Sequence, residues 1–178
     1  KIVPFRGEYL KFKKEYEDRV NHLVYPVPDS KYPFLGVHFT RMIDGSKEVG
    51  PNAVLALERE GYNRNSFSFR DAIESVTYPG LLKFVSKNFN FSINEFKSSL
   101  FMRDFVIKAQ KMIPDINESM LERGPSGIRA QAISPDGELQ MDFNIERHGR
   151  QIHILNAPSP GATASLAIAT YIIENYLK

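Results

Sequence analysis

The sequence of 178 residues contains no cysteine. This absence excludes disulfide staples, thiolate metal ligands and a cysteine nucleophile, and it neither requires nor forbids an oxidising compartment. The chain also lacks a strong charge bias, because 23 Lys and Arg residues are balanced by 21 Asp and Glu residues, which leaves a net charge of +2. A scattered basic excess of this size gives no footprint for a phosphate backbone. We therefore expect no nucleic-acid partner.

Long apolar runs and short signature motifs are missing as well. No run approaches the ~20 residues that a membrane-spanning helix needs, so we expect no spanning helix. The sequence has no G-x-G-x-x-G turn, phosphate-binding loop, G-x-S-x-G elbow or H-E-x-x-H pair, which excludes a self-contained nucleotide enzyme or serine hydrolase. The four histidines are not spaced as metal ligands and no carboxylate cluster joins them, so we expect no metal site.

The length is enough for one self-supporting core, since a chain of this size buries ~70% of the surface that its unfolded form exposes. No internal repeat or long linker divides it, so we expect residues 1–178 to form a single region. The first residue is Lys1, without an initiator Met or a leader pattern. We therefore expect an excised or processed piece of a longer protein.

The first ~60 residues predict an antiparallel sheet, because short alternating runs are separated by turn signals. The expected strands are 3–12, 22–27, 34–40 and 48–60, with a break at 28–30 and a turn at Asp44-Gly45. Gly50-Pro51 marks a bulge or an edge within the last of them.

The middle of the chain predicts helices, because apolar residues recur there at spacings of three and four. The expected helices are 68–75, 78–88, 92–99 and 100–112, with a short turn of helix at 117–123. Strands 127–133, 138–145 and 151–155 would then form a meander, followed by a final helix to about Tyr176 that is apolar nearly all round and therefore buried. The fold class is α+β: an antiparallel or mixed sheet with a helical insertion and a buried C-terminal helix.

The start of the final helix is the first candidate for chemistry. Ser159 fits an N-cap and Pro160 fits the first helical position. The small residues that follow would leave the first backbone N–H groups accessible to a partly anionic ligand. A well-capped core helix with no ligand is the competing interpretation.

An arginine on the 127–133 strand is the second candidate. We expect Ile128, Ala130 and Ala132 to face the core. Arg129 and Gln131 then share the opposite face, where a guanidinium could bind a carboxylate with two hydrogen bonds. A solvated or salt-bridged arginine is the alternative.

The third candidate is a histidine on the 34–40 strand. Alternation places Val37 and Phe39 on one face and His38 and Thr40 on the other. A neutral imidazole beside a hydroxyl suits general-base catalysis. A surface histidine or a satisfied core histidine is the alternative.

Six segments, taken in order, resemble the C-terminal half of FAD-dependent L-2-hydroxyglutarate oxidases and dehydrogenases, within the D-amino-acid oxidase and glycine oxidase superfamily. The segments are 4–9, 25–28, 36–45, 50–53, 127–132 and 156–167. The resemblance covers the whole chain and is weakest over 63–124.

The resemblance implies a two-domain flavoenzyme whose N-terminal dinucleotide-binding region is absent from this chain and holds most of the FAD. Arg129 would bind the substrate carboxylate, and the segment around the last helix would approach the flavin pyrimidine edge. The implied cofactor contacts are Asn156, Ser159, Pro160, Gly161, Ala162 and Thr163. Without the other region we expect the chain to bind FAD poorly and to be inactive alone.

The implied reaction is oxidation of L-2-hydroxyglutarate to 2-oxoglutarate with hydride transfer to FAD. His38 is the candidate base, and Thr40 would orient it or the substrate. Arg41, Arg6 and Tyr9 are unranked candidates for the second carboxylate.

The remaining expectations concern partners and location. The substrate is a small 2-hydroxy dicarboxylate, the electron acceptor is oxygen or a quinone, and the location is cytoplasmic, with peripheral association with the inner membrane as a variant. Two other functions stay open: a related oxidase of amino acids or glycerol phosphate, and a non-catalytic module that binds another protein through its sheet.

Overall fold

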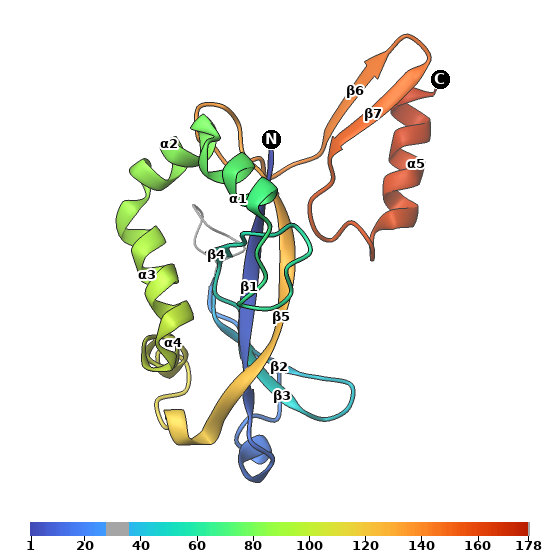
Figure 1. Cartoon of the computed structure of the whole chain (residues 1–178). Helices are drawn as coiled ribbons and strands as arrows, with labels where there is room; N and C mark the ends of the chain where they lie inside the picture. The colour runs from blue at the N-terminus through green and yellow to red at the C-terminus, as the bar shows by residue number, and fades with distance from the viewer. Residues whose placement is uncertain (28–35, 178) are drawn as a thin grey trace.

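The computed structural model describes residues 1–27 and 36–177, and it has the α+β fold that the sequence predicts (Figure 1). The main sheet has the order β2-β3-β1-β4, with β5 also paired to β1, and all its pairings are antiparallel. Its strands are β1 (Ile2–Phe12), β2 (His38–Arg41), β3 (Lys47–Gly50), β4 (Val54–Leu55) and β5 (Leu121–Ala132). A separate hairpin consists of β6 (Asn144–His148) and β7 (Gln151–Asn156).

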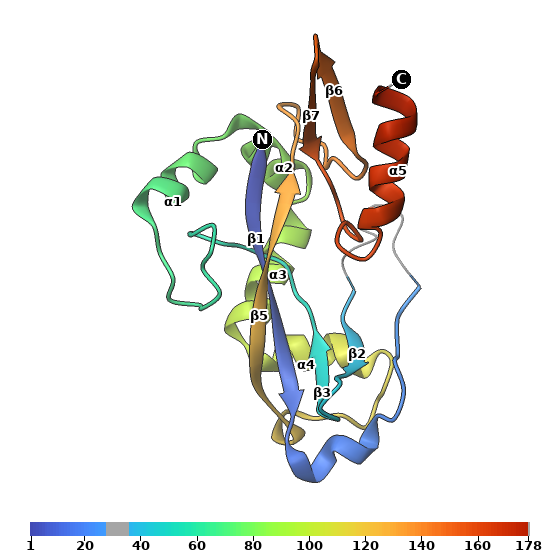
Figure 2. The same cartoon turned by 90° about the vertical axis from the view of Figure 1, so that its right-hand side faces the viewer.

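The long pair β1 and β5 forms the axis of the molecule, and both views show the two strands side by side (Figures 1 and 2). Side chains of β1 alternate between a buried face, which includes Leu10 and Phe12, and a half-buried face, which includes Phe5 and Tyr9. A period of two is the signature of a strand whose faces meet different surroundings. The prediction of a strand over 3–12 is confirmed.

Four helices lie between β4 and β5 in the sequence, as the spacing of apolar residues predicts. They are α1 (Phe69–Val76), α2 (Pro79–Lys87), α3 (Phe89–Leu100) and α4 (Met102–Gln110). The Ser68 hydroxyl accepts a hydrogen bond from the Asp71 N–H at 3.3 Å, and Pro79 begins α2, which are ordinary start signals. Short 3-10 helices occupy Lys14–Arg19 and Glu118–Met120.

Two apolar clusters hold the sheet and the helices together. In the larger one the rings of Phe12 and Phe39 lie 6.2 Å apart between centroids and pack with Phe105 of α4. The smaller cluster joins β1, α2 and the residue after β5 through Val3, Leu81, Phe84 and Ile133. Apolar burial of this kind is the main favourable contribution to folding.

The predicted turn at Asp44-Gly45 is confirmed, and it shares its glycine conformation with a second turn at 135–137. Gly45 and Gly137 both have φ of +89°, a left-handed conformation that side chains with a Cβ rarely adopt. In the first turn, an Asp44 side-chain oxygen accepts hydrogen bonds from the Ser46 N–H at 2.9 Å and from its hydroxyl at 2.7 Å. These short-range bonds fix the connection between β2 and β3.

Two expected strands are wrong in extent. Residues 22–27 form only one isolated bridge, between Val24 and Phe39, and Pro26 beside it has no N–H to donate. The expected strand 48–60 is divided into β3 and β4 because Pro51 interrupts the ladder. The break at 28–30 and the start of the 34–40 strand lie outside the described residues.

The predicted meander is confirmed only in its last pairing, between β6 and β7. Ten residue pairs join β5 to β1, more than 100 residues away in sequence, whereas 138–145 makes only the Ile133–Leu139 bridge before β6 begins. This long ladder replaces the local pairing that turn signals favour. The hairpin β6–β7 therefore stands as its own sheet, above the main body in Figure 1.

The last helix, α5 (Ser165–Tyr176), begins later than predicted and is not buried. Its N-cap is Ala164, and Leu166 is 85% exposed. Gly161 is a poor helix former, and the segment after Pro160 forms a turn instead of the first helical turn. In both views α5 lies beside the β6–β7 hairpin and away from the main body, so few neighbours among the described residues cover it (Figures 1 and 2).

Over the described part of the chain, no helix combines the length and the apolar character needed to cross a bilayer.

Candidate functional site

One face of the main sheet carries most of the candidate residues. Phe5 of β1 pairs with Arg129 of β5, and His38 of β2 pairs with Gly50 of β3. Tyr9 lies beside Gly50, because a Cβ added to that glycine would come within 2.6 Å of the Tyr9 ring. The register therefore brings Arg129, Tyr9 and His38, which are far apart in sequence, to the same side of the sheet.

A cavity of about 210 Å³ opens on this face. Tyr9, Arg129 and Gln131 contribute polar groups to its wall. The apolar part of the wall comes from the sheet, the helices and the segment after β5, through Phe5, Phe84, Phe91 and Leu139. An apolar pocket with a few convergent polar groups is the usual form of a small-molecule site.

The predicted core face of β5 is only partly correct. Of the residues expected in the core, Ala132 is buried, Ile128 is half-buried and Ala130 is exposed. On the other face Arg129 is exposed, whereas Gln131 and Ile133 are buried. Strand alternation separates two faces but does not say which one receives the helices. Here α2 covers the Arg129 face, since Ile133 packs with Leu81.

The environment of Arg129 suits a carboxylate ligand. Burial lowers the pKa of Arg129 from its usual range, and the nearby Tyr9 opposes this shift. A guanidinium nevertheless keeps its charge in proteins and offers two parallel N–H donors. Partial removal from water strengthens its attraction for an anion.

Tyr9 is a neutral hydroxyl donor beside that charge. Burial, with the Glu48 carboxylate nearby, raises the pKa of Tyr9, and Arg129 partly offsets the increase. A raised pKa keeps the phenol protonated at neutral pH. Tyr9 can therefore donate a hydrogen bond to a bound carboxylate.

Two contacts fix the orientation of the His38 ring. The ring stacks on Tyr25, with centroids 4.6 Å apart and planes 20° apart, and its Nδ1 lies 3.0 Å from the Gly36 carbonyl oxygen. Because a carbonyl only accepts, Nδ1 donates in this contact, and in a neutral imidazole the lone pair then lies on Nε2. Thr40 lies on the same face two residues along the strand and is half-buried.

Two of the candidates for binding the second carboxylate of the substrate, Arg41 and Arg6, do not line the cavity. Arg41 follows Thr40 and so lies on the opposite face of β2, where it is exposed. Arg6 lies on the buried face of β1 and binds Glu8. Of the three candidates, the cavity includes Tyr9 and neither arginine.

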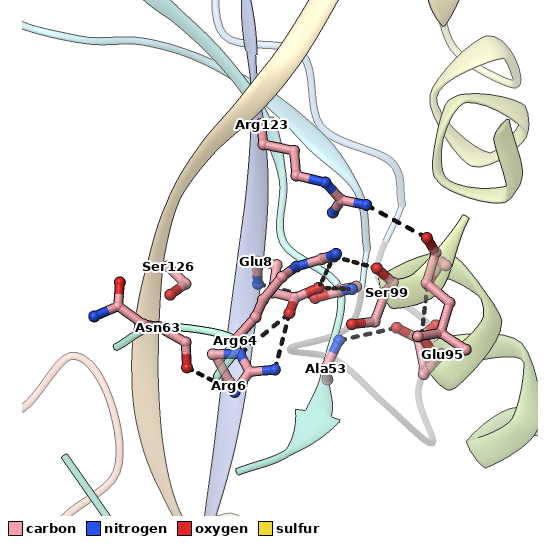
Figure 3. Close-up of polar contacts among 12 residues, drawn as sticks. Arg6, Glu8, Ala53, Asn63, Arg64, Glu95, Ser99, Arg123 and Ser126 are labelled. Atoms are coloured by element: carbon pink, nitrogen blue, oxygen red, sulfur yellow. Dashed lines mark hydrogen bonds and ion pairs between the residues drawn. The ribbon is translucent and has the colours of Figure 1, made fainter. Parts of the chain in front are cut away.

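On the opposite face of the main sheet from Tyr9, Glu8 is the centre of a buried polar network (Figure 3). One of its oxygens accepts from Arg6 at 3.0 and 3.1 Å, and the other accepts from Asn52 at 3.0 Å and Arg64 at 2.8 Å. Burial alone would raise the pKa of Glu8, but hydrogen bonds from Ser99, Asn52 and Arg64 lower it below its ordinary value. The carboxylate is therefore charged at neutral pH.

The segment expected to contact the flavin differs from its prediction. The Asn156 side chain is buried and donates to the Asp142 carbonyl at 2.8 Å, which anchors the start of the hairpin. Ser159 and Pro160 precede a turn rather than cap a helix, since α5 starts at Ser165.

The turn after Pro160 still offers backbone donors. The N–H groups of Gly161, Ala162 and Thr163 make no backbone hydrogen bond within the described residues. Ala162 and Thr163 are exposed, and a Cβ added to Gly161 would meet nothing closer than 3.5 Å. Three adjacent backbone donors on an open turn are accessible to a ligand rich in hydrogen-bond acceptors.

Sequence reasoning missed two members of the site. Tyr25, which stacks on His38, sits in a segment with only one sheet bridge, so strand periodicity does not place it. Gln131 was placed beside Arg129 but given no role, although alternation already put both on one face. Among the described residues, no group of three His, Asp or Glu side chains could hold a metal ion.

Comparison with known proteins gives relatives along the entire chain, although no protein-family model matches it. It is 49% identical over 178 residues to an L-2-hydroxyglutarate dehydrogenase of Indibacter alkaliphilus, covering all of this chain and 45% of that protein. The Escherichia coli K12 enzyme of the same name is 47% identical, with 97% and 41% covered, and the human mitochondrial one is 46% identical, with 98% and 39% covered.

The chain spans about two fifths of the length of these relatives. The similarity extends through the strands that carry Arg129, Tyr9 and His38 and on through the hairpin and α5, since it covers 97% or more of the chain. Identity near one half over such a length does not arise without common ancestry. The chain is thus homologous, along its whole length, to part of the L-2-hydroxyglutarate dehydrogenases.

Proposed function

We propose that this chain is the substrate-side region of an FAD-dependent enzyme that oxidises L-2-hydroxyglutarate to 2-oxoglutarate. The observation that carries the proposal is the cavity in which Arg129, Tyr9 and Gln131 converge, on the sheet face that also bears His38. The names of the relatives supply the substrate. Those names favour a hydroxy acid over an amino acid or glycerol phosphate, and the formed cavity favours an enzyme over a binding module.

Arg129 and Tyr9 would bind and orient one carboxylate of the substrate. Arg129 supplies charge and a two-pronged donor, and the protonated Tyr9 hydroxyl supplies a third hydrogen bond. The apolar side chains Phe84 and Phe91 would cover the carbon chain and exclude water. Fixing the substrate in this way lowers the entropic part of the barrier.

His38 would remove the hydroxyl proton. Its Nδ1–H is bound to the Gly36 carbonyl, so Nε2 is the accepting atom. As the substrate O–H proton moves to His38, the Cα–H bond breaks, its electron pair leaves as hydride, and the C–O bond becomes a carbonyl. The stacked Tyr25 ring would keep the imidazole in place during proton transfer.

FAD, when bound, would supply the hydride acceptor. The N–H groups of Gly161, Ala162 and Thr163 would hold its acceptor edge, with Ser159 and Pro160 shaping the turn and Asn156 anchoring it to the hairpin. The region that binds most of the dinucleotide would lie outside these 178 residues, and the isolated chain would be inactive. Reoxidation would use oxygen or a quinone.

The test is the rate of 2-oxoglutarate formation by the full-length protein and two histidine variants. His38→Ala should lower kcat by ~10²-fold, because it removes the general base. His153→Ala removes an exposed histidine of β7 and serves as the matched control with an unchanged rate. A His38→Ala enzyme within about twofold of the wild-type kcat would show that another group is the base.

A further inference from the structure

A second hollow lies on the other side of the main sheet from Arg129. Its volume is about 530 Å³, and it is bounded by β1, β5, the 62–65 loop and the region where α3 passes into α4. Arg64, Arg123, Asn65 and Ser126 contribute polar groups to its wall. Tyr9 is the only residue that it shares with the Arg129 cavity among the residues described. It is therefore a separate space with its own chemistry.

The charge around this hollow is unbalanced. Arg6 and Arg64 both bind Glu8, whose two oxygens already accept four side-chain hydrogen bonds. Arg123 lies above Arg64 and Glu8 in Figure 3, near enough for both to shift its pKa. Three guanidinium groups therefore share one nearby carboxylate, an excess of two positive charges, and those of Arg64 and Arg123 are accessible to solvent. An excess of positive charge in an accessible hollow attracts anions.

Arg123 is the least compensated member. Within the part of the chain that is described, it makes no ion pair, and its hydrogen bond is a long one of 3.4 Å to the Leu100 carbonyl. Burial lowers the pKa of Arg123, the neighbouring Arg64 lowers it further, and Glu8 only partly opposes them. Both the geometry and the charge therefore leave this guanidinium suited to accept an anion.

Arg64, unlike Arg123, forms an ion pair with Glu8. It is held between the Glu8 carboxylate and the Ser99 carbonyl, and its side chain remains 34% accessible. These two contacts fix the guanidinium, and its other N–H groups point away from Glu8 and Ser99. The fixed Arg64 guanidinium and the less constrained Arg123 guanidinium can donate hydrogen bonds from two sides to a ligand with several oxygen atoms.

We propose that the hollow between Arg64 and Arg123 binds a small oxyanion, a phosphate or a carboxylate, at a site distinct from the Arg129 cavity. Arg123 is the main donor, because no carboxylate among the described residues forms an ion pair with it. Arg64 supplies the second positive charge, and Ser126 and Asn65 stand at the wall as further polar contacts. Binding of an anion at this site needs neither flavin nor turnover. The proposal can therefore be tested independently of the proposed reaction.

The test is titration of the full-length protein with inorganic phosphate at constant ionic strength, followed by calorimetry and by the melting temperature. The wild type should bind, and Arg123→Gln should weaken binding by about tenfold or more, since a charged hydrogen bond is lost. Arg123→Lys keeps the positive charge but loses the planar guanidinium with its parallel N–H donors. Its affinity for phosphate should lie between those of the wild type and Arg123→Gln. Arg150→Gln, in the exposed β6–β7 turn, is the control of equal charge loss and should bind like the wild type.

A second titration with 2-oxoglutarate distinguishes the natural source of the oxygens. Binding that survives Arg129→Met but not Arg123→Gln would identify a carboxylate ligand, and phosphate binding alone would identify a phosphate. Two results would overturn the proposal: a wild type that binds neither phosphate nor, once Arg129→Met is introduced, 2-oxoglutarate, or affinities for these anions that are equal in the wild type and a folded Arg123→Gln. If Arg123→Gln unfolds, Arg123→Lys against Arg150→Gln gives the same decision.

Discussion

Glutamine in place of Glu8 should destabilise the protein by about 3 kcal/mol at neutral pH, the lower end of the cost of breaking a buried ion pair. The side chain of Glu8 is only 7% exposed, and its two oxygens accept four hydrogen bonds from Arg6, Asn52 and Arg64. Glutamine has almost the same shape but carries an NH₂ group in place of one oxygen. That group would face donors, and the buried arginines would lose their counter-charge.

The effect should depend on pH in a defined direction. The pKa of Glu8 in the folded protein is lowered from its ordinary value of 4.5. The stabilisation that the Glu8 carboxylate provides is therefore fully present above about pH 4.5. It is lost as the pH falls through the pKa that Glu8 has in the folded protein. The difference between wild type and Glu8→Gln should be constant near neutrality and should shrink in acid.

Urea unfolding followed by circular dichroism measures both predictions. Glu122→Gln removes an exposed carboxylate from β5 and is the control for charge alone, with an expected change within about 0.5 kcal/mol. A Glu8→Gln variant as stable as this control would refute the reasoning. So would a stability gap that stays the same at low pH.

Three further changes test other parts of the molecule. Arg129→Met should raise the KM for L-2-hydroxyglutarate by roughly tenfold to a hundredfold, since a charged hydrogen bond contributes about 1.5–3 kcal/mol, and steady-state kinetics would show it. Phe39→Ala should lower the free energy of unfolding by about 3–5 kcal/mol, because Phe39 is fully buried against Phe12; a loss below 1 kcal/mol, roughly that of a surface change, would contradict the core assignment. Gly137→Ala should cost at least about 1–2 kcal/mol, because the residue has φ of +89° and an added Cβ would lie 2.8 Å from the Phe84 nitrogen; unfolding curves equal to those of the wild type would contradict it.

Local signals in the sequence predicted α1 to α4 better than they predicted α5 or the sheet. The short helix expected at 117–123 is a 3-10 turn at Glu118–Met120, and β5 begins at Leu121. Ser68 and Pro79 mark helix starts that depend on nearby residues alone, so α1 and α2 lie within a residue of their expected ranges. The pairing of β5 with β1 depends on residues more than 100 positions apart, which no turn signal encodes. Alternation did not predict that residues on both faces are buried at the end of β5, where Gln131 and Ala132 are each 8% exposed.

The sequence suggests members of the candidate site but not how they lie relative to one another. Residue type and strand position point to Arg129 and His38, and only the register shows that both lie on one side of the sheet. The exposure of α5 could not be predicted from its apolar composition, because burial requires neighbours as well as side chains. The Tyr25–His38 stack likewise depends on a segment that joins β2 through a single bridge, between Val24 and Phe39.

The most direct test of the account is anaerobic reduction of the full-length protein by candidate substrates, followed through flavin absorbance. L-2-Hydroxyglutarate should bleach a bound flavin, and D-2-hydroxyglutarate, glycine and glycerol 3-phosphate should not. A full-length protein that binds no flavin, or a flavin that amino acids or glycerol 3-phosphate reduce in place of L-2-hydroxyglutarate, would contradict the proposed function.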